Sequence, residues 1–470
     1  MLRAVVRPGP VRRAVVVTTL TAGAAAILLW DGSPGLPPRA QRTLAIFVVA
    51  LGLWVSKALP HMVTSMLAII LFPLFGVCDA RDAFARFGHP AVFFILGTFI
   101  LSAGMSETGL ARRIALRLIR ATGHSPPALV TGVFTFGLVA SCFVSEHAVA
   151  ALQLPIVLEL VKALTEPGMP DGRRLGRAMF LAVAWGCVIG GVTTFLGGAR
   201  APVALGILDE GWGETLSFWD YTTAALPVMV PVAVVGLALV RWLARGLDVD
   251  LDRGRELLTG EIARMGPLSV REIAMGVLLA VTVVLWIVTG PQWLAVIALA
   301  AISVGFLFEL ITWPWVHKNV DWGLILMYGG AVVVGSMVVD TGLARWAGDA
   351  LLRSLDGYGI TWMFTSLLSI VVLVLTEGCS NTAVVAASVP VAVPLGLDLG
   401  LSPTSVTVLV TLASGFAFLL PMATPALAMA LASGHVRPLE MIRLGVPLKV
   451  VAAIVLVVAD RVIWPWIGVF

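Results

Sequence analysis

Apolar residues in this chain are grouped into long runs separated by short polar joints. Most runs hold about 16 to 22 residues, the length that an α-helix needs to cross a hydrocarbon layer of about 30 Å. We therefore expect an all-α polytopic membrane protein with about 11 transmembrane helices. The predicted spans are residues 14–30, 43–58, 62–78, 91–107, 178–208, 224–242, 273–290, 293–311, 322–340, 402–433 and 444–466.

Two further segments, 126–165 and 361–396, have a different pattern. Each consists of two apolar arms around a polar centre, which is Ser145-Glu146-His147 in the first and Ser380-Asn381-Thr382 in the second. A polar interruption that runs straight into a second apolar arm is typical of a chain that enters the membrane and returns. The pattern predicts two re-entrant hairpins.

Composition excludes a soluble protein. The chain has 59% hydrophobic and 12% charged residues and a mean hydropathy of +0.99, whereas roughly a quarter of the residues in soluble domains are charged. Most of the 31 Lys and Arg residues fall on one side of the predicted spans, which the positive-inside rule assigns to the cytoplasm. We expect a multi-pass protein of the cell (inner) membrane with its N-terminus in the cytoplasm and its C-terminus outside. Arg200 is the only basic residue that this threading leaves inside the membrane.

The sequence repeats itself. Residues 108–112, Thr-Gly-Leu-Ala-Arg, recur as residues 341–345, the two polar centres align, and Pro155 matches Pro390. Each half also contains a long span broken by small residues, at 197–202 and 423–426. We expect a first span in 1–40, a first repeat in 41–245, a cytoplasmic connection in 246–272 and a second repeat in 273–470. The threading inverts one repeat relative to the other, which is typical of secondary transporters.

The interrupted segments have a definite chemistry. Unwound backbone at membrane depth leaves carbonyl and amide groups without helical partners, so something polar must bind there. Carbonyl, Ser, Thr and Asn oxygens suit a small hard cation, whereas helix N-terminal amides favour an anion. We therefore expect one site to bind both kinds of ion.

These motifs resemble the divalent anion/sodium symporters, which carry dicarboxylates, citrate or sulfate. The second half carries the resemblance most clearly, through Ser380-Asn381-Thr382 and the broken helix that begins at Pro421. The resemblance implies an elevator-type transporter that works as a homodimer in the lipid bilayer, with Na⁺ as coupling ion and no further cofactor. It also implies a second sodium site at Thr376, Ser380, Asn381 and Ala423, and substrate contacts at Asn381, Thr382, Thr424 and Pro425.

The first half departs from the family pattern. Ser141, Ser145 and Gly197 match the first sodium site, but Glu146 and His147 replace an Asn-Thr pair, and Arg200 lies in the broken helix. Three alternatives remain open. Glu146 could bind the cation while His147 and Arg200 contact the anion; Arg200 could replace one sodium ion beside Glu146, giving a carrier with fewer coupling ions or an exchanger; or Glu146 and His147 could relay protons.

The leading hypothesis is a sodium-coupled symporter for a small divalent anion, most plausibly a four-carbon dicarboxylate. A sulfate-type carrier, a sodium-independent exchanger and a proton-coupled carrier are the alternatives, and a passive anion channel is a more remote one. We do not expect an enzyme, because His147 is the only histidine predicted deep in the membrane and no hydrolase motif accompanies it. Nucleic-acid binding is not expected either, because the basic residues are spread over membrane-proximal loops.

A first prediction concerns the second polar centre. Asn381→Ala or Thr382→Ala should abolish substrate uptake while the protein still folds, because each removes a side chain expected to contact the anion. Uptake into proteoliposomes and gel filtration of the purified variants would measure the two effects. Normal uptake by both variants would remove the second centre from the site.

Overall fold

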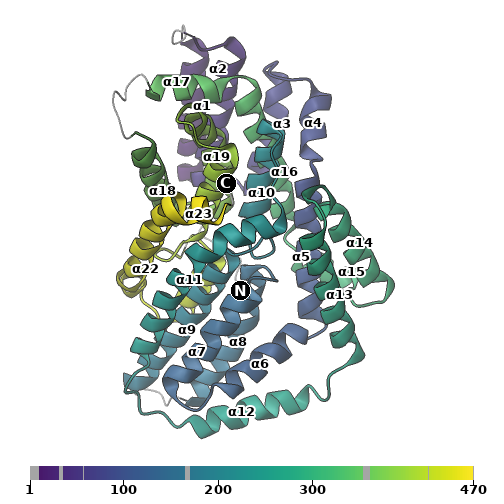
Figure 1. The fold of residues 1–470 in the computed structure, drawn as a ribbon, viewed down its shortest axis with the longest axis vertical. Coiled ribbons are helices and arrows are strands. Elements are labelled where there is room, and N and C mark those ends of the chain that lie inside the picture. Colours follow the sequence, from purple (N-terminus) through teal and green to yellow (C-terminus); the bar gives the residue numbers. More distant parts are fainter. Residues whose placement is uncertain are drawn as a thin grey trace.

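The computed structural model describes residues 10–30, 35–56, 58–164, 170–352, 360–421 and 423–468. All regular structure in these residues is helical (Figure 1). The first half contains α1 (Pro10–Leu29), α2 (Pro38–Ser56), α3 (His61–Leu74), α4 (Ala80–Phe87), α5 (Pro90–Glu107), α6 (Leu110–Ala121), α7 (Pro126–Ala140), α8 (Glu146–Leu164), α9 (Pro170–Gly191), α10 (Arg200–Trp212), α11 (Phe218–Leu243) and α12 (Leu251–Arg264). The second half contains α13 (Val270–Val288), η1 (Pro291–Trp293), α14 (Leu294–Leu307), α15 (Trp313–Asn319), α16 (Trp322–Asp340), α17 (Leu343–Leu352), α18 (Ile360–Gly378), α19 (Asn381–Asp398), α20 (Pro403–Gly415), α21 (Pro425–Ala432), α22 (Pro438–Val458), η2 (Ala459–Ile463) and α23 (Trp464–Ile467). The chain end expected in the cytoplasm, residues 1–9, lies outside the described residues.

Nine helical segments in the described part of the chain are long and apolar enough to cross a membrane. They include α8, α18 and α19, which are arms of the two predicted hairpins. Five shorter apolar helices are also present: α7 is the other arm of the first predicted hairpin, and the rest, among them α3 and α20, cover predicted spans. The protein is therefore a multi-pass membrane protein. Helix length does not reproduce the expected 11 spans one by one, because α8, α18 and α19 of the predicted hairpins are as long as the predicted spans.

The two helix breaks lie earlier in the chain than expected. We predicted them at 197–202 and 423–426, but the helices stop at Gly191 and Gly415 and resume at Arg200 and Pro425. Residues 200–202 therefore form the first turn of α10. A proline is tolerated in a first turn because its missing N–H has no helical partner there, so Pro202 and Pro425 lie just after the breaks.

Helix α9 forms the centre of the first half and packs beside α7, α8 and α11 (Figure 1). Gly186 and Gly190 lie four residues apart on one face of α9, against the carbonyl groups of Phe134 and Leu138 on α7. Small residues at this spacing let two helix backbones approach closely, which is a common way to join helices in a membrane.

The repeated pentapeptide has the same structure in both halves. Thr108 and Thr341 each end a helix, and their hydroxyl groups donate to the carbonyl groups of Gly104 and Met337. The glycines that follow, Gly109 and Gly342, have φ values of 83° and 78°, which favour glycine. The helices that begin next, α6 and α17, lie toward opposite ends of the molecule (Figure 1).

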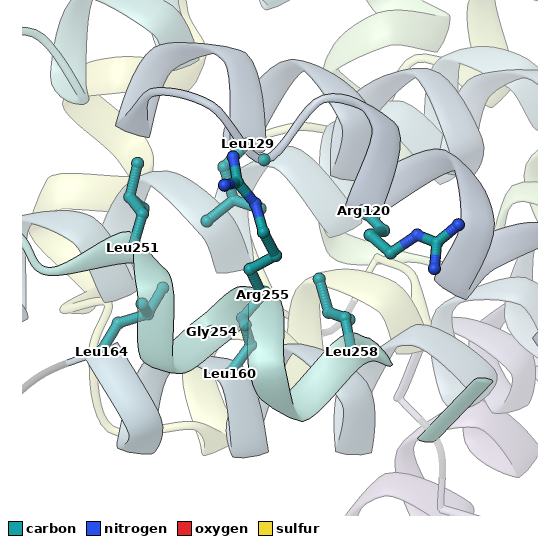
Figure 2. A pocket seen from close by; sticks show the side chains of 9 residues that line it. Arg120, Leu129, Leu160, Leu164, Leu251, Gly254, Arg255 and Leu258 are labelled. Carbon is teal, nitrogen blue, oxygen red and sulfur yellow. The ribbon is translucent and has the colours of Figure 1, made fainter. Parts of the chain in front are cut away.

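The connection between the halves contains α12, which runs along the end of the molecule beside α6 and α8. Figure 2 shows a recess lined by Leu160 and Leu164 of α8 and by Leu251 and Leu258 of α12. The recess contains none of the residues predicted for the site. Arg120 and Arg255 also line it, so leucines and two arginines together join the connection to the first predicted hairpin.

A buried ion pair fastens α6 to the start of α13. The Arg113 guanidinium donates to both Glu272 carboxylate oxygens at 2.6 and 3.0 Å, and both side chains are only 3% exposed. Its remaining N–H groups donate to the carbonyl groups of Met265, Gly266 and Pro267. The neighbouring Arg112 is 49% exposed and pairs with Glu261 instead.

We expect Arg113→Met to lower the free energy of unfolding by about 3–5 kcal/mol, because it leaves a buried carboxylate without its partner. Arg112→Met is the matched control and should cost at most about 1 kcal/mol, since its pair is exposed to solvent. Unfolding of both variants in detergent micelles gives the comparison. Equal losses would show that burial of the Arg113–Glu272 pair does not matter.

Candidate functional site

The first hairpin and the first broken helix meet at their polar ends. The turn 141–145 joins α7 to α8, and the Glu146 amide donates to the Gly197 carbonyl at 2.9 Å. Ser141 and Ser145 are buried, and the Ser141 carbonyl lies against Gly197. The structure thus brings together the four residues predicted for the first sodium site.

An ion pair between Arg200 and Glu146 lies at the predicted first sodium site. The Arg200 guanidinium donates through Nη1 to Glu146 Oε2 at 3.3 Å, and the two side chains are 3% and 1% exposed. Each charge would be costly at this depth by itself, whereas the pair is neutral overall. The structure thus has Arg200 beside Glu146, the arrangement named in the second of the three alternatives.

The nearby helix ends stabilise the charges of Glu146 and Arg200 at their observed positions. Glu146 is the first residue of α8, where the helix dipole favours a carboxylate. Arg200 is the first residue of α10, where the same dipole opposes a positive charge. Its guanidinium instead lies against Gly415, the last residue of α20, where the negative end of that helix favours a cation.

Three glycines make room for the pair. A Cβ added at Gly191 would collide with the Glu146 carboxylate, and one at Gly198 would stand 2.6 Å from Arg200 Nη1. One at Gly415 would stand 2.6 Å from Arg200 Nε. Gly415 belongs to the second broken helix. The Arg200 side chain of the first half is therefore in contact with the second half at this residue.

Arg200 retains unused hydrogen-bonding capacity. Its Nε and Nη2 groups are buried and have no hydrogen-bond partner among the described residues. Leaving a buried donor of a charged group unsatisfied costs more than the roughly 1–3 kcal/mol of a neutral one. These N–H groups are therefore strong potential donors to an anion.

His147 lies at the edge of this site rather than inside it. Its Nδ1 atom is 3.7 Å from Glu146 Oε1, and its side chain is 39% exposed.

The buried Tyr328 of α16 lies beside Thr382 on the other hairpin. Tyr328 was missed in the sequence, although a tyrosine in the middle of an apolar span is a signal that could have identified it.

The second hairpin and the second broken helix meet in a cluster of oxygen atoms. Thr376 Oγ1 lies 2.7 Å from Asn381 Oδ1 and 2.5 Å from the Ser414 carbonyl oxygen. One hydroxyl proton serves only one of these two acceptors, so the cluster has more oxygen atoms than donors. Such a cluster suits a hard cation. Ser414 contributes through its backbone, which residue type alone does not reveal.

The remaining residues predicted for the second half differ in their burial. Thr424 is buried and caps α21, because its hydroxyl accepts from the Leu427 amide at 3.4 Å. Ala423 and Thr382 are buried, Ser380 is partly buried, and Pro425 is exposed. Ser380 and Thr382 flank Asn381 of the oxygen cluster in the sequence, and Ala423 and Thr424 precede α21.

A second buried ion pair lies behind the second broken helix. Lys449 Nζ of α22 donates to Glu377 Oε1 at 2.6 Å and to the Phe416 carbonyl at 2.7 Å. Glu377 in turn accepts from the amides of residues 418, 419 and 420. Lys449 lies within the predicted span 444–466, and Glu377 neutralises its charge there.

A multi-pass helical bundle with polar sites at two helix breaks has the architecture of a secondary transporter. Residues 12–470 match the family described as the sodium:sulfate symporter transmembrane region, and the chain belongs to this family. It is 26% identical over 442 residues to the sodium-dependent dicarboxylate transporter SdcS of Staphylococcus saprophyticus, which covers 88% of this chain and 85% of that protein. It is 25% identical over 469 residues to the SdcS of Staphylococcus aureus, covering 93% and 88%. Both relatives are named as transporters.

Two solved structures have a similar fold. The Alcanivorax borkumensis YdaH transporter matches with a TM-score of 0.53 and 14% identity, covering 97% of this chain and 98% of that one. Neisseria gonorrhoeae MtrF matches with a TM-score of 0.56 and 14% identity, covering 94% and 97%. At this identity the likeness concerns the fold alone.

The Glu146–Arg200 pair generates a prediction about stability. Glu146→Gln or Arg200→Gln alone should lower the free energy of unfolding by about 3–5 kcal/mol, because each leaves one buried charge unpaired. The double variant should recover a large part of this loss, since no charge remains. Unfolding of all four proteins in detergent micelles completes the cycle, and strictly additive losses would argue against the pair.

Proposed function

We propose that this protein is a secondary active transporter that moves a small dicarboxylate across the cell membrane together with sodium. The observation that carries the proposal is the oxygen cluster of Thr376, Asn381 and the Ser414 carbonyl, which suits a sodium ion. The two SdcS relatives, named as sodium-dependent dicarboxylate transporters, support both the cation and the class of substrate.

The first cation position carries a fixed charge in this proposal. Arg200 stands beside Glu146, where the family resemblance implies a sodium ion, so the carrier binds one sodium ion fewer. The dicarboxylate docks between the hairpins. Asn381, Thr382, Thr424 and Pro425 contact it from the second half, and the Nε and Nη2 groups of Arg200 and the half-exposed His147 contact it from the first half.

The movement follows from the arrangement of the repeats. We propose that the two halves are inverted repeats with re-entrant hairpins, and that a homodimer holds the scaffold helices still while the hairpins and broken helices move as an elevator. The location of α6 and α17 toward opposite ends of the molecule supports the inversion (Figure 1). The N-terminus then faces the cytoplasm and the C-terminus the outside.

The proposal is tested by uptake of radiolabelled succinate into proteoliposomes, with an inward sodium gradient against a sodium-free control at equal pH. Sodium-dependent accumulation is expected.

Thr376→Val should abolish the sodium dependence, because it removes an oxygen atom from the cluster. Thr407→Val is the matched control, since the Thr407 hydroxyl is buried on α20 with no partner among the described residues. Sodium-independent uptake would indicate an exchanger or a proton-coupled carrier instead.

Membrane voltage then reports the number of sodium ions. One sodium ion with a divalent anion carries a net negative charge, so an inside-negative voltage opposes uptake. At about 100 mV this amounts to about 2.3 kcal/mol, or roughly 50-fold lower accumulation. Two sodium ions would make the transport electroneutral. Accumulation that is indifferent to voltage would therefore contradict the replacement of one sodium ion by Arg200.

A further inference from the structure

The unwound segment between α20 and α21 is bound from behind by two charged side chains. The Glu377 carboxylate accepts from three consecutive backbone amides, at 2.9 Å from residue 418 and at 3.0 Å from residues 419 and 420. Lys449 donates to the Phe416 carbonyl at 2.7 Å. Four backbone groups that have lost their helical partners are thereby satisfied by one ion pair.

The pair is enclosed by protein. The Glu377 and Lys449 side chains are 7% and 13% exposed, and Lys449 Nζ is 2.6 Å from Glu377 Oε1. Helix α22 approaches the unwound segment closely through Gly445, where an added Cβ would stand 2.6 Å from the Phe418 carbonyl oxygen. The segment is thus fixed between α18 and α22, with little freedom to shift.

This support is directly connected to the oxygen cluster. Thr376, which contacts the Ser414 carbonyl, precedes Glu377 in α18, and Ser414 lies two residues before Phe416. Glu377 and Lys449 therefore hold the backbone at residues 416–420, directly after the Ser414 carbonyl that Thr376 contacts. Neither charged group lies within the set of oxygen atoms itself.

We propose that Glu377 and Lys449 are positioning residues for cation binding: they fix the unwound segment so that the Ser414 carbonyl stays directed at the ion. This inference rests on the proposed function, because it assumes that sodium binds at the Thr376–Asn381–Ser414 cluster. It adds a role for a buried charge pair outside that cluster. Partners that orient a ligand without touching the ion commonly alter affinity by about 10–100-fold.

The test measures sodium binding without transport. Purified protein is unfolded by heat across a series of NaCl concentrations, with choline chloride keeping the ionic strength constant. Sodium should raise the unfolding temperature of the wild type, because a ligand that binds the folded state stabilises it. Lys449→Met should need about tenfold more sodium for the same increase, and Lys449→Arg should remain closer to the wild type because it keeps the charge.

Thr365→Val is the matched control. The Arg461 guanidinium donates to the Thr365 hydroxyl at 3.0 Å and joins α18 to η2, the continuation of α22, far along the helices from the cluster. Thr365→Val should keep the sodium response of the wild type, even if it lowers the unfolding temperature. If Lys449→Met does not fold, Glu377→Asp shortens the carboxylate while retaining its charge and should produce the same loss of sodium affinity.

The outcomes separate the two proposals. A wild-type protein whose unfolding temperature is indifferent to sodium would overturn cation binding at the cluster, and the proposed function with it. A wild-type sodium response that Lys449→Met, or Glu377→Asp in its place, retains unchanged would overturn only the positioning role. An equal loss of sodium affinity in Thr365→Val would do the same, because it would trace the effect to general packing of the two helices.

Discussion

Unwound backbone inside an apolar bundle is the constraint on which the rest of this structure depends. Each amide or carbonyl that leaves a helix at membrane depth must find another partner, because water is scarce there. In the second half the Glu377–Lys449 pair meets this requirement by bonding four backbone groups, whereas in the first half Glu146 and Arg200 pair with each other beside the break. Both pairs are neutral overall, so each brings strong hydrogen-bonding groups into the bundle without adding net charge.

The two halves use their ion pairs in different ways. Glu146 and Asn381 occupy matching positions in the repeat, and so do Cys142 and Glu377. In the first half the charged pair lies where the cation is expected, whereas in the second half it lies behind the broken helix and leaves the oxygen cluster open. The two ion pairs therefore lie in different places relative to the two helix breaks.

The contact between Arg200 and Gly415 joins these two half-sites. The guanidinium extends from the first broken helix to the end of α20, and Ser414 of the oxygen cluster directly precedes Gly415. A change in the position of either broken helix therefore affects the surroundings of both. Since a side chain at Gly415 would collide with Arg200, the glycine is required by the guanidinium rather than by its own backbone conformation.

The sequence by itself determined the class of protein and the approximate helices, and it proposed the residues of the candidate site. Hydrophobic runs, the internal repeat and the Ser380-Asn381-Thr382 motif are local patterns, so they can be read without coordinates. The limits of the breaks were misplaced by several residues, because small residues and prolines are compatible with a first helical turn as well as with a break. Local patterns do not distinguish these cases.

Only the tertiary structure decided which charges meet. Glu146 and Arg200 are 54 residues apart, and Glu377 and Lys449 are 72 residues apart. Whether Glu146 faces a cation, an anion or an arginine depends on how two helices pack, and the same holds for Lys449, which resembles an interfacial residue in the sequence. The sequence does not reveal the Ser414 carbonyl either. Every residue has a carbonyl group, and only the fold determines which one is left without a helical partner.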